Sequence, residues 1–124
     1  MDSILTSIKK LLGIDKDYTH FDQDVIIHIN SVLFILRKAG VGPDDPFTIK
    51  SDAETWTDFL GDDLEELEAV KTYVYMKVKL IFDPPLSSAA MESLKELIRE
   101  YEWLLNVEAD TISLDGEEEN QNGV

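Results

Sequence analysis

The sequence predicts an all-α protein, a small bundle of about four to five helices with a flexible acidic tail at its C-terminal end. Three observations support this class. Apolar residues recur at helical spacing in five segments, and the stretches between them are rich in Gly, Pro and Asp, as loops are. The two longest expected helices are separated by Pro84 and Pro85, which allow no continuous helix.

The first expected helix spans residues 3–12, where Ile4, Leu5 and Ile8 fall on one face. Gly13 follows it as a natural C-terminal stop. The acidic connector that comes next leads to Asp22, whose carboxylate is suited to cap the second helix.

The second expected helix, residues 23–39, is the most apolar stretch of the chain and contains "VIIHINSVLFIL". A helix that is apolar nearly all round lies either at the centre of its domain or beneath another chain. A chain of 124 residues has little room to wrap a helix completely, which favours the second possibility. Ile27, Phe34 and Ile35 are therefore candidate contacts with another subunit or partner.

The middle of the chain is expected to hold a loop over residues 39–52, in which "PFTI" suits an extended strand. A short helix then carries Trp56 and Phe59 and ends at Gly61. The fourth helix is expected over residues 62–82.

The fifth helix is expected over residues 89–107, with Arg99 standing three residues before Glu102 at the spacing of an ion pair. Its apolar face includes Leu94, Leu97, Ile98, Tyr101, Leu104 and Leu105.

An elbow of Asp83, Pro84 and Pro85 separates these two long helices. Pro84 excludes the helical conformation from the residue before it, and neither proline can donate a backbone N–H. The fourth helix must therefore stop by about residue 83, and Ser87 or Ser88 can cap the fifth. We expect a rigid elbow rather than a flexible hinge.

The end of the chain has the composition of a flexible tail. Residues 110–124 are acidic, contain no basic residue and have little apolar content, so they cannot repay their ordering entropy. We therefore expect one helical domain, residues 1–109, followed by the tail.

The charge balance excludes some classes of partner. With 26 acidic and 11 basic residues the net charge is -15, which argues against general binding to nucleic-acid phosphates or to anionic lipid. The chain has no cysteine, so disulfides, thiolate zinc sites and cysteine nucleophiles are excluded. No apolar run approaches the roughly 20 residues of a membrane span, and we expect no export signal.

No motif for catalysis or metal binding stands out. His20 and His28 are the only histidines and form no metal-binding pair. A calcium loop read from Asp15 puts His20 where Gly belongs and Ile26 where Glu belongs. We therefore expect no enzyme, no metal and no cofactor.

Three aromatic residues are further candidates for contact with another subunit or partner. Trp56, Tyr75 and Trp103 most simply pack in or near the core, but Trp and Tyr are also common anchors of protein interfaces. Trp103 and Tyr75 fall off the main apolar stripes of their helices, which strengthens their candidacy.

The order of the segments resembles a known family. "ILTSIKKLLGI", "YTHFDQDVIIHINSVLFIL", "GVGP", "WTDFLG", "LEAVKTYVYMKVKLIFDPP" and "EWLLNVEAD" together resemble the small head–tail connector proteins of long-tailed bacteriophages, also called head-completion or adaptor proteins. The resemblance covers about residues 4–110.

The resemblance implies a structural protein of the virion without catalytic residues. Such proteins form a ring beneath the portal vertex, extend the DNA channel and offer a platform to the next connector, stopper or tail protein. About twelve subunits would match the portal symmetry. It also implies assembly in the host cytoplasm, a place at the head–tail interface, and DNA that passes through the lumen without specific binding.

Two other classes fit the composition. One is an acidic DNA mimic that inhibits a host protein, although Lys71, Lys77 and Lys79 interrupt the regular array of negative charge that a mimic needs. The other is a small helical adaptor that bridges a host protein. The size of the assembly and the nature of the partner distinguish these classes from a connector.

Overall fold

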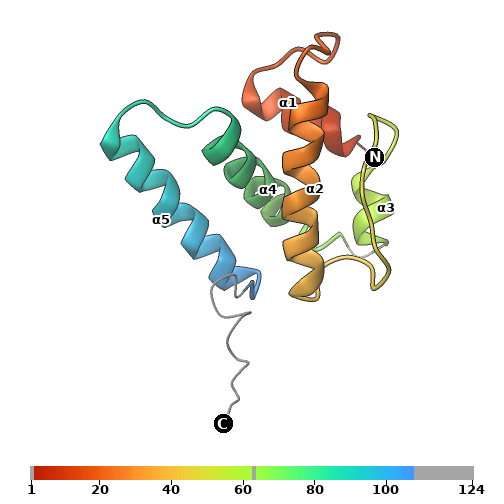
Figure 1. The fold of residues 1–124 in the computed structure, drawn as a ribbon. Coiled ribbons are helices and arrows are strands. Elements are labelled where there is room, and N and C mark those ends of the chain that lie inside the picture. The colour runs from red at the N-terminus through yellow and green to blue at the C-terminus, as the bar shows by residue number, and fades with distance from the viewer. Residues whose placement is uncertain (1, 63, 108–124) are drawn as a thin grey trace.

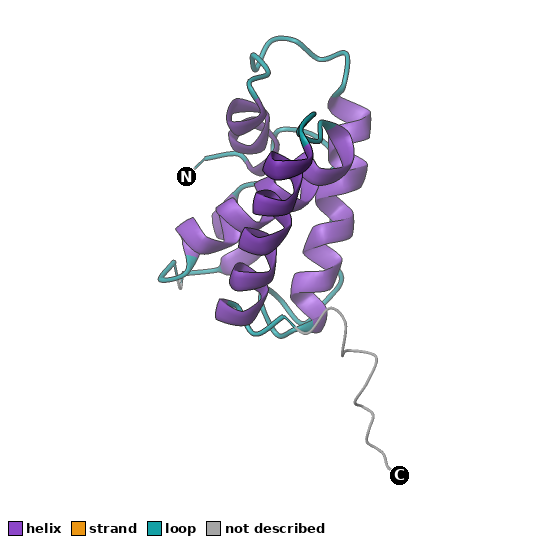
Figure 2. Ribbon diagram, turned by 90° about the vertical axis from the view of Figure 1, so that its left-hand side faces the viewer, coloured by secondary structure: helices purple, strands orange, loops and turns teal. Residues whose placement is uncertain are grey.

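The computed structural model describes residues 2–62 and 64–107. The described part of the chain forms five helices and no strand, which confirms the all-α prediction (Figures 1 and 2). The expected tail, residues 110–124, lies outside the described residues. The helices are α1 (Ile4–Leu12), α2 (Asp22–Lys38), α3 (Trp56–Leu60), α4 (Leu67–Phe82) and α5 (Ser88–Leu104).

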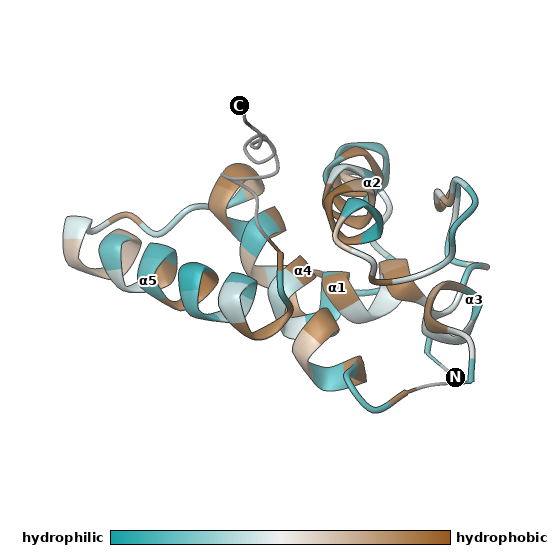
Figure 3. Cartoon of the chain, turned by 90° about the horizontal axis from the view of Figure 1, so that it is seen from below, coloured by the Kyte–Doolittle hydropathy of each residue, from teal (hydrophilic) through white to brown (hydrophobic). Residues whose placement is uncertain are grey.

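Helix α4 is the centre of the bundle. It packs against α1, α2 and α5, and Figures 1 and 3 show α2 and α5 on different sides of it. Val70, Tyr73, Val74 and Val78 of α4 are fully buried. One face of α2 packs on α4 and the other is open to solvent, so the subunit does not wrap this helix completely; its cover by another chain stays a prediction.

Local capping rules explain several helix ends. Gly13 ends α1 with a φ of 84°, a left-handed conformation that glycine adopts without strain. Thr55 begins α3 through a capping box with Asp58, and Gly61 ends it. These ends confirm the predicted bounds of the first and third helices to within a few residues.

The start of α2 differs from the prediction. Asp22 does not cap the helix: it is the first helical residue, and Phe21 before it makes no side-chain cap. The Asp22 carboxylate instead lies 2.7 Å from the ammonium of Lys9 in α1. Lys9 is buried and also donates to the carbonyl oxygens of Lys16 (3.2 Å) and Tyr18 (2.8 Å). A buried ammonium needs such acceptors, so it ties α1, the connector and α2 together.

No strand forms at the predicted "PFTI" segment. The side chain of Asn30 in α2 takes the place of a neighbouring strand, since its amide donates to the carbonyl oxygen of Ile49 (3.0 Å). Its carbonyl oxygen in turn accepts from the Ile49 N–H (2.8 Å). Ile49 is buried against the core, so one residue anchors the long loop to α2.

Helix α4 begins at Leu67, later than the expected residue 62. A turn precedes it, in which the Leu67 N–H donates to the carbonyl oxygen of Leu64 (3.1 Å). Four acidic residues crowd positions 62–66, and like charges at this spacing weaken a helix.

The elbow lies where the sequence predicts it. Helix α4 ends at Phe82, and Asp83 has a non-helical backbone, with φ −147° and ψ 64°. Ser87 then caps α5, its hydroxyl accepting from the Ala90 N–H at 3.0 Å. Pro84 and Pro85 lie between these two ends, and α5 runs back alongside α4 (Figure 1).

Candidate assembly surfaces

The outer face of α2 carries two exposed apolar side chains. Ile27 is 60% exposed and Phe34 is 54% exposed. They stand seven residues apart, about two helical turns, so they lie on one line of the helix. The ammonium of Lys38, one turn beyond Phe34, lies 5.3 Å from the centre of its ring. The α2 face, defined here as Ile27, Phe34 and Lys38, is therefore apolar with a positive charge at one end.

Two flanking residues hold this face outward. Asn30 binds the loop at Ile49, and Arg37 donates to the carbonyl oxygens of Pro43 (3.2 Å) and Asp44 (2.9 Å). These bonds attach the loop to one flank of α2, while the opposite face of the helix is buried in the core. Rotation of α2 about its axis would break them.

Helix α5 leaves more of its apolar surface open. Among its 17 described residues it buries one side chain, that of Ile98. Trp103 is 81% exposed, Leu104 59% and Leu97 43%. Trp103 and Leu104 line a shallow hollow together with Glu96, Arg99 and Glu100; these five residues define the α5 face.

One polar group attaches α5 to the core. The Tyr73 hydroxyl of α4 donates to the Glu102 carboxylate of α5 at 3.0 Å, and the Lys77 ammonium lies 3.7 Å from the same oxygen. Burial raises the pKa of Tyr73 well above its usual range, and the charge and hydrogen bond of Glu102 raise it further. Tyr73 thus remains a neutral hydrogen-bond donor at physiological pH.

The comparison with protein families decides what class of protein presents these surfaces. A family model described as phage connector protein matches residues 4–111, most of the chain. The chain belongs to the phage connector protein family. No curated protein and no solved structure matches it. The family confirms the resemblance to head–tail connectors found in the sequence and supports a structural role in association with other virion proteins.

The candidate contact residues of this connector fall into three groups. Ile27, Phe34 and Trp103 are exposed, as a contact residue must be. Ile35 and Tyr75 are half-buried and pack against the core, which leaves part of each side chain accessible. Trp56 is fully buried, and this corrects its candidacy.

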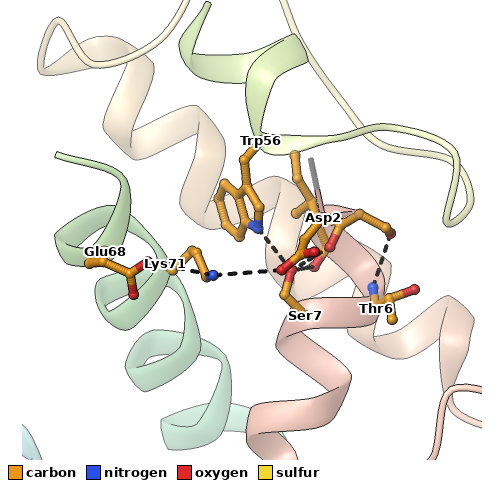
Figure 4. A network of polar contacts seen from close by, with 8 residues as sticks. Asp2, Thr6, Ser7, Trp56, Glu68 and Lys71 are labelled. Atoms are coloured by element: carbon orange, nitrogen blue, oxygen red, sulfur yellow. Dashed lines mark hydrogen bonds and ion pairs between the residues drawn. The ribbon is translucent and has the colours of Figure 1, made fainter. Parts of the chain in front are cut away.

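The burial of Trp56 has a specific cause. Its indole N–H donates to the Ser7 hydroxyl at 2.8 Å, which joins α3 to α1 (Figure 4). The Ser7 hydroxyl in turn donates to the Ser3 carbonyl oxygen. A side chain with both its ring and its polar atom satisfied inside the subunit offers nothing to a neighbour.

Several residues of this connector are exposed although their sequence pattern does not predict it. Leu97 and Leu104 were expected on the buried face of the fifth helix, but they lie about 100–120° around the helix from Ile98. Because α5 packs on α4 through a narrow strip, residues at the edge of the apolar face stay exposed. Leu86 at the elbow and Ile81 at the end of α4 are exposed too.

A hollow between α1 and α4 contains charged residues of both signs. Lys71 in it lies 4.0 Å from the Asp2 carboxylate and 3.8 Å from that of Glu68 (Figure 4). Within residues 2–62 and 64–107, no three His, Asp or Glu side chains cluster to hold a metal ion. Nor is any helix of the described part long and apolar enough to cross a bilayer.

Proposed function

We propose that this connector is a ring-forming subunit between the portal and the tail, where it extends the DNA channel and completes the head. The observation that carries the proposal is the exposed apolar surface on both α2 and α5, the two helices on different sides of α4. A closed ring needs two different, complementary faces on each subunit. This chain has two such candidates.

The elbow has a natural role in a ring. Asp83, Pro84 and Pro85 set the turn between α4 and α5, and the Glu102 contacts hold α5 near its other end. The angle between the α2 face and the α5 face then depends on a turn with little conformational freedom. Identical subunits with a constant angle between their two faces can close a ring.

The charge of the chain suits a channel for DNA. A net charge of -15 gives the lumen no basic excess with which to grip phosphates, so DNA can pass without specific binding. The partners proposed are further copies of the chain, the portal protein, and the next connector, stopper or tail protein. A ring that matches the portal would contain about twelve subunits, assembled in the host cytoplasm and retained in the virion at the head–tail interface. No cofactor or catalysis is part of the proposal.

The substitution Phe34→Asp tests the proposal. Because Phe34 is half exposed, the variant should keep the helical circular dichroism and the thermal unfolding of the wild type. It should lose the assembly that sedimentation detects for the wild type, alone or with the purified portal ring of the same phage. Thr48→Asp, at an exposed loop position, is the matched control and should assemble.

Each result has a clear meaning. Normal assembly by Phe34→Asp would remove Phe34 from the contact, and an unfolded variant would place Phe34 in the core. If the wild-type chain does not bind the portal but binds a DNA-binding enzyme, the result would favour the alternative function of an acidic DNA mimic.

A further inference from the structure

We propose, on the basis of the ring function above, that Phe34 of one subunit seats in the hollow beside Trp103 of a second copy. The same contact brings Lys38 of the α2 face against Glu100 of the α5 face. The occupant of the α5 face is thus the α2 face of the neighbouring subunit in the ring.

The hollow has the size and lining for such a contact. Its volume is about 470 Å³, within the range of about 300–1000 Å³ typical of binding pockets. Trp103 and Leu104 supply the apolar surface, and Glu96, Arg99 and Glu100 supply polar groups around it. An aromatic side chain that enters an apolar hollow with a polar rim is the usual form of an interface anchor.

The charges beside the two aromatic residues are complementary. Among the described residues Lys38 makes no ion pair, and its ammonium lies only near the Phe34 ring. Glu100 likewise forms no ion pair among the residues that the structure describes, whereas Glu96 is bound by Arg99 at 3.1 Å. The α2 face therefore offers a free positive charge and the α5 face a free negative one. Contact between the two faces would pair the Lys38 ammonium with the Glu100 carboxylate.

The same charges disfavour the symmetric alternatives. Two α2 faces in contact would bring two lysines to one interface, and two α5 faces would bring two copies of Glu100. Like charges at an interface are repelled, which selects against these pairings. The pairing of unlike faces is a heterologous contact, the kind that repeats identically from subunit to subunit and closes a cyclic ring.

Chemical cross-linking tests the contact directly. The chain has no cysteine, so a double variant with Lys38→Cys and Glu100→Cys carries thiols at these two positions alone. A short bis-maleimide should then give a ladder of covalent multimers on a denaturing gel, because each contact joins the α2 face of one subunit to the α5 face of the next. Either single variant carries one thiol and can give dimers at most.

The failure of this contact is distinguishable from the failure of the ring. If sedimentation shows that the double variant assembles on the portal ring but the cross-linker gives no ladder, the contact is wrong and the ring function stands. If the wild-type chain forms no assembly larger than a monomer, with or without the portal ring, both proposals are overturned.

Charge reversal gives a second readout that needs no cross-linker. Lys38→Glu and Glu100→Lys should each shift the midpoint of assembly to a higher protein concentration, since each brings like charges together. The double reversal should restore the midpoint toward that of the wild type. The combination of Lys50→Glu with Glu100→Lys has the same change in composition at an unrelated loop position and should not restore it. Equal restoration by both combinations would show that net charge, and not this pair, controls assembly.

Discussion

Helices α1 and α5 are both amphipathic, but the fold buries very different shares of their apolar faces. Of the nine residues of α1, five are buried: Ile4, Leu5, Ser7, Ile8 and Lys9. Of the 17 described residues of α5, Ile98 alone is buried. The difference comes from their neighbours, since α1 packs against both α2 and α4 and is bonded to α3, whereas α5 packs against α4. An amphipathic pattern thus indicates a helix but not how much of its apolar face the same chain will cover.

Because of this difference, we expect the α1 to α4 region to be more stable than the segment that contains α5. The region of α1 to α4 has a continuous core, and Lys9, Asn30 and Trp56 satisfy their polar atoms within it. The α5 arm, defined as residues 88–107, is attached by Ile98, by two buried residues after the helix and by the Glu102 contacts. Segments with few buried contacts open at lower free energy than the rest of a protein. The part of the subunit with the most exposed apolar surface is therefore the part held most weakly.

The two tryptophans provide the largest test of this contrast. Trp56→Ala removes a fully buried ring and leaves the Ser7 hydroxyl without its donor, so we expect the free energy of unfolding to fall by about 3–5 kcal/mol. Trp103→Ala, at an exposed position, is the matched control and should change it by less than about 0.5 kcal/mol. Unfolding in urea measures both. Similar losses for the two variants would mean that the α5 arm is as well covered in solution as the core.

The attachment of α5 gives a smaller and more local effect. Glu102→Ala leaves the buried Tyr73 hydroxyl without an acceptor, which costs about 1–3 kcal/mol. Hydrogen exchange should show this loss mainly in the amides of α5, with those of α2 closer to the wild type. Glu100→Ala is the control, because it removes an exposed carboxylate of the same helix that forms no ion pair among the described residues. An equal loss of protection in α2 and α5 would show that the arm does not open separately.

The parts of the fold that could be predicted follow from rules that act within a few residues. Gly13 and Gly61 end helices because their backbones leave the helical region, and Pro84 ends α4 because it restricts Asp83. The number of helices and the position of the elbow follow from such rules. These rules depend on neighbouring residues alone, so they apply without knowledge of the rest of the chain.

Other errors concern side chains that take a different partner, often one far away in the sequence. Arg99 was expected to pair with Glu102, but Glu96 binds it and Glu102 binds Tyr73 and Lys77 of another helix. In the same way Asp22 pairs with Lys9 rather than capping its own helix. A side chain can bind a partner nearby in the sequence or one far away, and the spacing of residues along a helix predicts only the nearby partner.

The candidate contact surface was predictable only in part, for the same reason. The excess of apolar residues on α2 indicated exposed surface, and Ile27 and Phe34 are exposed as that excess requires. The sequence favoured Trp103 as a contact residue because it falls off the main apolar stripe of its helix, but it did not exclude Trp56, which the structure buries. The hollow beside Trp103 and the free charge of Glu100 depend on how α5 lies against α4.

The smallest predicted effect at neutral pH comes from Tyr73→Phe. The variant loses one hydrogen bond to Glu102 and should change stability by about 1 kcal/mol. This deficit relative to the wild type shrinks at alkaline pH, because only the wild type has the Tyr73 hydroxyl, which the folded state keeps protonated above its usual pKa near 10. The unfolded chain loses that proton above about pH 10, so there it binds fewer protons than the folded chain, and stability falls as the pH rises.

Below about pH 10 the contribution of Tyr73 is fully present, and it is lost above that pH. Unfolding in urea between about pH 9 and 11 should therefore show a shallower fall for Tyr73→Phe than for the wild type. Tyr18→Phe, at an exposed position of the connector between α1 and α2, is the matched control and should keep the wild-type slope. If Tyr73→Phe also keeps that slope, the hydroxyl is hydrated in solution. The α5 arm would then leave its seat on α4 even in the free subunit, which would make its attachment weaker still than the comparison with α1 indicates.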